Sequence, residues 1–481
     1  MRNAPHGPVP SPRGPLGRAP VTAIVTTSLL VVGLAGIIYV TVAGQAHGGW
    51  APLSGMLAAW AVFVAAALAA RRLPARHAGT FVLLGSLLLG GVATSAPPVI
   101  SSDSARYAWD GMVQKAGISP YAYVPADQAL ESLRPGWLFH EPAPGENCYT
   151  HPFPTGTVIT TNSPDGSPLC TAINRPHVPT VYPAVAELYF LAVRLAPGPE
   201  VGFIAFQLAG LAISLGVTAM LLRFLRRAGR PAHQAVWWAW CPLVAFEAVN
   251  GAHVDVLGAA LAAASALLLA GGRPLRSGVA FGAAVAAKLI PVITAPGLLY
   301  RKPGRFVLAA AGTFAAAYAP YVLAGGPAVL GYLPGYLREE GYVGGGTTSR
   351  FALLQVALPA PWDVVAGILL LAGLALHVWR HTGPANPWDG QVLMTGATLL
   401  VASPAYEWYA LLLLPFVVLS RRYEYLLIPP VLTVMYLTGG QPYATWLDRL
   451  LLAAAALLIA AAAVWRRRRA RTDVAGPPLA I

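Results

Sequence analysis

Long apolar stretches separated by short basic segments dominate the chain. The first, Val21–Ala43, carries no charge and is long enough to cross a bilayer at about 1.5 Å per residue. The pattern predicts an all-α polytopic membrane protein with about 12 transmembrane helices and both chain ends in the cytoplasm. The predicted spans are Val21–Ala43, Leu53–Ala70, Gly79–Ala96, Val201–Leu222, Gln234–Val249, Val254–Ala270, Phe306–Leu323, Val364–Trp379, Val392–Ser403, Trp408–Leu419, Tyr425–Thr438 and Leu447–Trp465.

Two further apolar segments do not fit a simple crossing. Val181–Leu195 is short for a span, and Glu187 and Arg194 fall on one helical stripe, which favours an interfacial or re-entrant helix. Ser277–Tyr300 has arginines on both sides, and a single crossing would place the basic C-terminal tail outside the cell. We therefore predict a broken, re-entrant element there, with Lys288 near its tip and two prolines as breakers.

The longest polar segment begins at Ser101 and runs to about Thr180. A loop of this length is unusual unless it is functional. Its first turns are two-faced at helical spacing, with Ala105, Ala108, Trp109, Met112 and Ala116 on one side and Asp103, Arg106, Tyr107, Asp110 and Gln114 on the other. This predicts a helix that lies flat on the membrane surface and turns two carboxylates, Asp103 and Asp110, toward water.

The charge distribution defines the predicted domains. Most of the 32 basic residues fall in predicted cytoplasmic segments and most of the 19 acids fall at the outer side, so the net charge of +13 is a topology signal and excludes a nucleic-acid surface. The predicted organisation is a disordered cytoplasmic tail (1–20), a transmembrane domain (21–465) and a basic cytoplasmic tail (466–481). Within the domain, 101–200 is the large first extracytoplasmic loop with amphipathic helices, and 324–355 is a second one.

Composition adds a compartment. Arginine far outnumbers lysine, and alanine, glycine and proline are abundant, which is typical of a GC-rich bacterial genome. Cys148 and Cys170 share the polar loop, so they are expected to pair if that loop faces an oxidising compartment; the alternative is two unrelated thiols.

Asp103 is the first candidate for chemistry. A carboxylate at the membrane edge is well placed to take a proton from a hydroxyl while a lipid-linked reagent arrives through the bilayer. The alternatives are a helix cap or an ion pair with Arg106. Asp110, two turns along, is equally compatible with a solvated surface acid. No pair of acids has the spacing of a metal-binding D-x-D motif.

His253 and Asp255 stand at an outer turn after Glu247. Ionisable groups at the membrane boundary are functional candidates because burying them without partners costs several kcal/mol. The alternative is structural hydrogen bonding among these three residues. His-x-Asp without a third ligand does not predict a metal site.

Two cations are candidates for an anion site. Lys288 lies within an apolar run and needs an anionic partner, either a phosphate headgroup or a protein carboxylate. Arg350 follows a glycine run, and a guanidinium suits phosphate geometrically; the alternative is a loop arginine paired with Glu339 or Glu340. Trp408 at an outer helix end is more typical of an interfacial aromatic belt than of a sugar platform.

Several blocks together resemble a known family. They are DSARYAWDG (103–111) with GISPYAYVP (117–125), NRPHVPTVYPAV (174–185), NGAHVD (250–255) and KLIP (288–291). As a set they resemble the bacterial polyprenyl-phosphate-mannose-dependent mannosyltransferases of the GT-C superfamily, over about residues 75–420. The resemblance implies a GT-C-like fold, an active site outside the bacterial cytoplasmic (inner) membrane, and a base carried by D-x-x-x-Y, which matches Asp103 and Tyr107.

The resemblance also implies roles and partners. The reaction would be an inverting transfer of a sugar, expected to be mannose, from a polyprenyl-phosphate donor to a hydroxyl of a glycolipid or polysaccharide. No cofactor is required, since phosphate is already a good leaving group. The implied site comprises the catalytic acids Asp103 and Asp110, the donor-phosphate cations Arg350, Lys288 and His253, and the substrate-binding residues Tyr107, Trp109, Asn174, Tyr182, Glu187 and Asp255.

Two other functions compete with this interpretation. A transporter or lipid-sugar flippase places polar broken helices at the midplane and often has inverted repeats, whereas here polar residues gather on one side and no repeat is evident. A non-catalytic assembly scaffold predicts that Asp103 tolerates substitution.

Overall fold

The computed structural model describes residues 18–44, 50–143, 145–150, 153–154, 158–300, 303–326, 329, 335, 338–339 and 350–474. Three predicted features lie outside these residues: nearly all of the 1–20 tail, the second half of the 466–481 tail, and most of the 324–355 loop, including its glycine run and Glu340.

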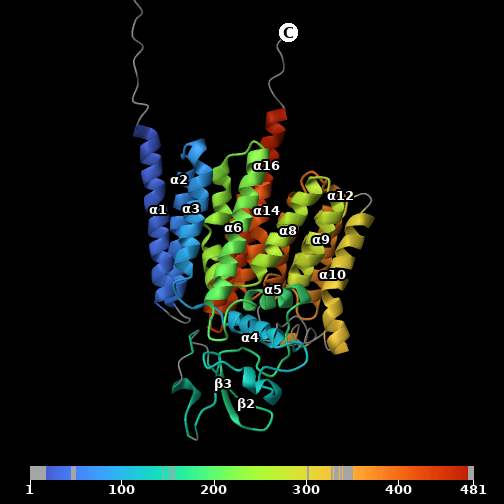
Figure 1. Cartoon of the computed structure of the whole chain (residues 1–481). Coiled ribbons are helices and arrows are strands. Elements are labelled where there is room, and N and C mark those ends of the chain that lie inside the picture. Colours follow the sequence, from blue (N-terminus) through green and yellow to red (C-terminus); the bar gives the residue numbers. More distant parts are fainter. Residues whose placement is uncertain are drawn as a thin grey trace, which may run out of the picture.

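The molecule is a bundle of helices with a small domain at one end (Figure 1). Two helices, α4 and α5, lie across that end, and the strands lie beyond them. The start of α1 and the end of α16 lie at the opposite end. The described α-helices are α1 (Arg18–Ala43), α2 (Trp50–Ala70), α3 (Ala75–Ala93), α4 (Asp103–Lys115), α5 (Ala184–Arg194), α6 (Ile204–Arg227), α7 (Val236–Ala239), α8 (Asp255–Ala270), α9 (Pro274–Ala287), α10 (Gly304–Gly325), α12 (Trp362–His381), α13 (Trp388–Ala402), α14 (Leu413–Ser420), α15 (Ile428–Thr438) and α16 (Ala444–Val474).

Shorter helical turns join them. These are the 3₁₀ helices η1 (Gln128–Leu133), η2 (Cys148–Thr150), η3 (Ala232–Ala235), η5 (Ile290–Gly297), η7 (Leu354–Val356), η8 (Glu407–Leu412) and η9 (Tyr423–Leu427), and the π-helix η4 (Val244–Asn250).

Seven of the described helices are long and apolar enough to cross a membrane, or eight if the bent pair η4 and α8 counts as one span. Large apolar side chains on them face outward; Leu308 is 74 % and Leu323 is 87 % exposed. A polypeptide in water would bury such surface, so these helices indicate a multi-pass membrane protein.

The predicted count of about 12 spans is not confirmed. Several predicted spans are short helices that pack inside the bundle; Leu413–Leu419 of α14 is buried along its whole length. A helix that is apolar all round has the same hydropathy whether protein or lipid surrounds it.

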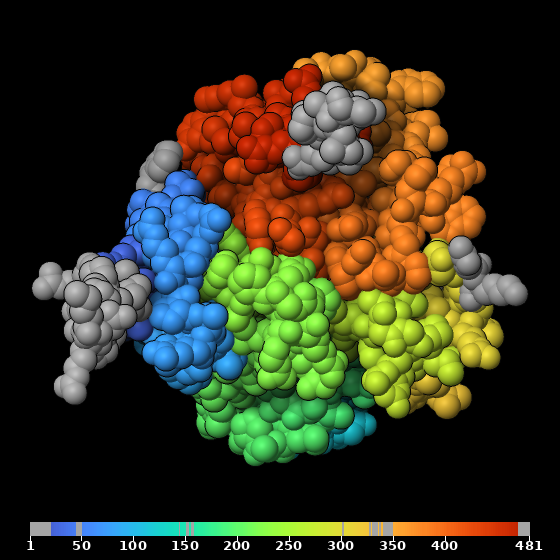
Figure 2. Space-filling view, turned by 90° about the horizontal axis from the view of Figure 1, so that it is seen from above, coloured from blue at the N-terminus to red at the C-terminus, as the bar shows by residue number. Residues whose placement is uncertain are grey.

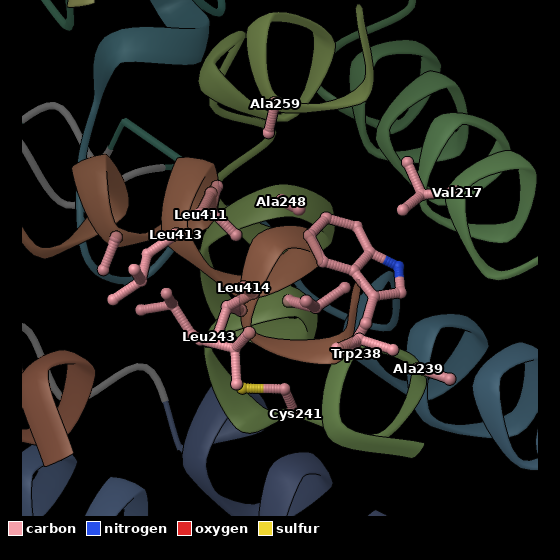
Figure 3. Packing of buried hydrophobic residues seen from close by; sticks show 14 of the residues in the cluster. Val217, Trp238, Ala239, Cys241, Leu243, Ala248, Ala259, Leu411, Leu413 and Leu414 are labelled. Atoms are coloured by element: carbon pink, nitrogen blue, oxygen red, sulfur yellow. The ribbon is translucent and has the colours of Figure 1, made fainter. Parts of the chain in front are cut away.

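The main core lies where η4, α6, α8 and α14 meet (Figure 3). Trp238 fills its centre and donates a hydrogen bond from Nε1 to the carbonyl of Ser214 on α6 at 3.1 Å. A buried indole N–H needs such a partner, and this bond fixes α7 against α6.

The two apolar segments that were not predicted to be simple crossings, Val181–Leu195 and Ser277–Tyr300, fold differently from each other. The predicted interfacial helix corresponds to α5, which lies across the end of the bundle beside α4 (Figure 1). In the predicted re-entrant segment, α9 ends at Ala287, the backbone is extended at Lys288, and η5 begins at Ile290. The chain is therefore interrupted at Lys288.

The end domain contains a sheet that the all-α expectation missed. Its strands are β1 (Phe139–His140), β2 (Ile159–Asn162) and β3 (Pro168–Thr171), in the antiparallel order β1-β3-β2. Cys148 and Cys170 form a disulfide that ties η2 to β3. A separate apolar core, which includes Trp109 of α4, packs beneath the sheet. Strands of two to four residues give too little alternation to be recognised from sequence.

Candidate functional site

The connection that delivers Asp103 is fixed by two buried amides. Asn250, at the end of η4, donates from Nδ2 to carbonyls at the end of α3 and accepts the Val99 N–H at 3.1 Å through Oδ1. Gln207 on α6 donates to the carbonyls of Ala96 and Asn250. The orphan carbonyls of a helix end inside protein need such partners. The turn after α3 is thus held in place, and it leads directly into α4.

Asp103 is the first residue of α4 and opens onto a cavity of about 760 Å³. The cavity lies at the bundle end where α4 and α5 cross, and residues from six parts of the chain line it. They are Ile100, Ser101, Ser102, Asp103, Asn174, Arg175, Val181, Tyr182, Pro183, Lys288, Leu289, Ile290, Glu339, Tyr406, Trp408, Tyr409 and Tyr436.

The Asp103 carboxylate has two distinct neighbours. Asn174 Nδ2 donates to Oδ1 at 2.7 Å, and His253 Nε2 lies 3.9 Å from Oδ2. The side chain is 15 % exposed. A carboxylate that is oriented by an amide and partly open to a cavity is equipped to accept a proton.

His253 is fully buried behind Asp103. Its Nδ1 lies 3.1 Å from Glu247 Oε2, and its ring stacks on Trp408 with centroids 4.0 Å apart. The structural contact between Glu247 and His253 is therefore present, yet the other ring nitrogen points at Asp103. This arrangement fixes the ring between two acids.

Lys288 supplies positive charge to the cavity. Its Nζ lies 3.1 Å from Asp255 Oδ2 and 5.5 Å from the ring centroids of Tyr182 and Tyr409. A protein carboxylate is thus one partner of this ammonium group. Because an ammonium has three donors and Lys288 lines the cavity, it can also bind an anion there.

Arg350 does not line the cavity. Its side chain is buried and donates to the carbonyl of Ser403 at 3.2 Å. Of the two acids that the sequence offered as its partners, Glu339 pairs with Arg175 at 2.7 Å, and Glu340 lies outside the described residues. That ion pair joins the first loop to the second at the cavity wall.

Of the three aromatic residues expected to bind substrate, Tyr182 alone is in the lining. Tyr107 is buried and stacks on Phe190 with centroids 4.4 Å apart, and Trp109 packs against Phe139 of β1. Four further rings also line the cavity, namely Tyr406, Trp408, Tyr409 and Tyr436. Trp408 was expected in an interfacial belt, and the three tyrosines were not among the predicted site residues. Three of the four rings fall within one short stretch of the chain, and that clustering was the available signal.

Asp110 and Glu187 lie away from the cavity, and the expectation that Asp110 faces water is wrong. Asp110 is buried and receives hydrogen bonds from Arg106 Nε at 2.8 and 2.9 Å. Glu187 is also buried and accepts from Gln114 at 2.8 Å. The reason is that α5 covers this face of α4, approaching so closely that a side chain at Gly111 would meet the backbone of α5.

Burial shifts the pKa values of Asp110 and Glu187. Loss of hydration raises the pKa of Asp110, although Arg106 opposes the shift. Loss of hydration also raises the pKa of Glu187 well above its ordinary value, and the negative charge of Asp110 adds to this. Both groups lie outside the membrane-spanning helices. One proton shared by the two acids leaves this Arg-Asp-Glu cluster neutral, as a buried cluster requires.

Among the residues that the structure describes, no three His, Cys, Asp or Glu side chains converge as metal ligands.

Comparison with known proteins gives one match. The profile of glycosyltransferase family 87 matches residues 180–404. No curated protein and no solved structure matches the chain. The matched part contains Tyr182, His253, Asp255 and Lys288, and it begins after Asp103 and Asn174. Together with the apolar helices, this match indicates a membrane glycosyltransferase of the GT-C-like type.

Proposed function

We propose that the protein transfers a sugar, mannose by its resemblance, from a polyprenyl-phosphate donor to a hydroxyl of a glycolipid or polysaccharide. The active site is the cavity at Asp103, on the extracytoplasmic side of a bacterial cytoplasmic membrane. The observation that carries the proposal is that a carboxylate and an ammonium group, those of Asp103 and Lys288, line one cavity. This cavity lies at the end of the helix bundle in a chain that matches a glycosyltransferase family.

Asp103 is the base. The acceptor oxygen attacks the anomeric carbon, its proton passes to an Asp103 oxygen, and the bond from the anomeric carbon to the phosphate oxygen breaks. The configuration at that carbon inverts. Asn174 holds one carboxylate oxygen at 2.7 Å, which leaves the other to receive the proton.

His253 is assigned here to the support of Asp103 rather than to the donor phosphate. It is buried outside the cavity lining, and its Nε2 is 3.9 Å from Asp103. Glu247 and Trp408 fix the ring, so it stabilises one orientation of the base.

Lys288 stabilises the departing phosphate. The leaving group gains negative charge as the sugar bond breaks, and an ammonium group in a partly dehydrated site offsets that charge. The residues that follow, Leu289 and Val292, are 40 % and 52 % exposed apolar side chains. They offer the polyprenyl chain an apolar path out of the cavity, while Tyr182 and the other aromatic rings in the lining contact the sugars.

The experiment is transfer from radiolabelled polyprenyl-phosphate mannose in membranes that contain Asp103→Asn. The amide keeps the shape and cannot accept the proton, so transfer should fall by about 10²- to 10⁴-fold. Asp165→Asn, in an exposed turn of the end domain, is the matched control and should keep full activity.

Full transfer by Asp103→Asn would remove Asp103 as the base. Translocation of the sugar lipid by the unaltered protein, without transfer to any acceptor, would favour a flippase. A panel of lipid-linked donors identifies the sugar.

A further inference from the structure

A second cavity, of about 530 Å³, lies at the opposite end of the bundle, between the end of α6 and the turn from α8 to α9. Figure 2 looks onto this end, where α6 (green) and the α8–α9 turn (yellow-green) are neighbours. From Gln207, beside the Asp103 turn, α6 runs about 30 Å to Arg227 at 1.5 Å per residue. The two cavities are thus separated by the thickness of a bilayer's hydrocarbon.

Three arginines form its rim: Arg223 and Arg227 on α6, and Arg273 after α8. All three are exposed, and no acidic residue among those that the structure describes lines the cavity. Over the described ranges, none of the three side chains has an ion pair or a hydrogen bond. By contrast, Arg230 nearby donates to the carbonyls of Val418 and Leu419.

The rim concentrates uncompensated charge. Arg223 and Arg227 are four residues apart and so lie on the same face of α6, where like charges repel. A neighbouring hollow shares Arg273 and adds Arg276 and Arg305, and its lining, as far as the structure describes it, also has no acid. Topology alone requires basic residues at this end, but it does not require them to surround a cavity.

The floor is apolar and half-buried, formed by Met220, Phe224, Ala264, Leu267 and Leu268. Phe224 is held by an edge contact with Trp388, with ring centroids 5.1 Å apart. A small inorganic anion would make no favourable contact with such an apolar floor. A phospholipid places its phosphate at a basic rim and its acyl chains along apolar side chains between helices.

We propose that this arginine-rimmed cavity binds one anionic phospholipid from the membrane leaflet at this end of the bundle, opposite the Asp103 cavity. The phosphate group lies among Arg223, Arg227 and Arg273, and the acyl chains pack on Phe224 and Leu268. The site stabilises the contact of α6 with α8 and is separate from the proposed transfer reaction.

The test uses the full-length protein in a neutral detergent, with phosphatidylglycerol added at rising concentration. Thermal melting gives the shift, and native mass spectrometry counts retained lipid. The melting temperature should rise and saturate with phosphatidylglycerol, with one lipid retained. Phosphatidylcholine and inorganic phosphate should leave it unchanged.

Two variants locate the site. Arg223→Gln/Arg227→Gln/Arg273→Gln should weaken the lipid effect on the order of a hundredfold, since each arginine near a lipid surface contributes about fivefold to affinity. Ala264→Phe fills the floor with every arginine kept and should also abolish the shift. The matched control, which removes the same charge outside any described cavity, is Arg71→Gln/Arg72→Gln/Arg76→Gln, and it should behave as wild type.

Three outcomes would overturn the proposal. An equal loss in the control would mean attraction to the whole basic end, an equal shift with inorganic phosphate would mean an anion site without lipid, and no retained phosphatidylglycerol on the wild type would mean no site. The last measurement needs no variant, so a rim variant that fails to fold leaves the proposal testable.

Discussion

Asn250→Ala is expected to damage both stability and activity, although Asn250 lies outside the cavity lining. Its buried amide donates to the carbonyls of Ala93, Ala96 and Pro97 at 3.0 to 3.2 Å and accepts the Val99 N–H at 3.1 Å. Alanine removes about two well-formed hydrogen bonds, each contributing about 1 kcal/mol, and leaves a buried N–H without a partner at about 1–3 kcal/mol. The expected loss is therefore about 3–5 kcal/mol.

The same change should lower the rate of transfer. The turn held by Asn250 leads to Asp103, and a displacement of about 1 Å at a catalytic group costs on the order of 10²-fold. We therefore expect a lower kcat with little change in donor KM. Asn250→Asp keeps the acceptor for the Val99 N–H but places a carboxylate oxygen against the three carbonyl oxygens, which repel it. This variant should therefore be at least as harmful as Asn250→Ala.

The assays are thermal melting in detergent and initial rates of sugar transfer. Asn162→Ala, on the exposed side of β2, is the control and should match wild type in both. If Asn250→Ala melted and reacted like wild type, the turn would be held by other contacts and the reasoning would fail.

The remaining predictions concern three buried features. The disulfide between Cys148 and Cys170 closes a separation of 22 residues, so Cys170→Ser should destabilise the end domain by about 2–4 kcal/mol, read as faster proteolysis there; an unchanged rate would contradict it. Because its folded pKa is raised, the contribution of Glu187 to stability is complete below about pH 4 and is lost as pH rises toward the raised value. Glu187→Gln should therefore flatten the fall of melting temperature with pH, and an unaltered slope would refute this. Lys288→Met leaves Asp255 buried without its partner and should cost about 3–5 kcal/mol, whereas Lys288→Met/Asp255→Leu should recover stability but not transfer; equal melting of the two variants would count against the pair.

The sequence by itself determined the class of protein and the segments that matter. Apolar runs and the placement of arginines predicted a polytopic membrane protein with its polar chemistry at one end. The reason is that charge is costly in lipid, so charged residues are confined to the segments between spans. The interruption at Lys288, the short helix after Val181 and the polar loop were also visible as local violations of the apolar pattern.

The tertiary structure decided which residues meet. Asp103 and Asp110 look equivalent on one helix, yet α5 covers Asp110 and leaves Asp103 at a cavity. Asn174 is 71 positions from Asp103 in the sequence and His253 is farther, yet both lie beside its carboxylate. No spacing rule predicts such contacts. Burial is the physical reason: hydropathy measures what a segment prefers, whereas the neighbour that removes its water is chosen by packing of the whole chain.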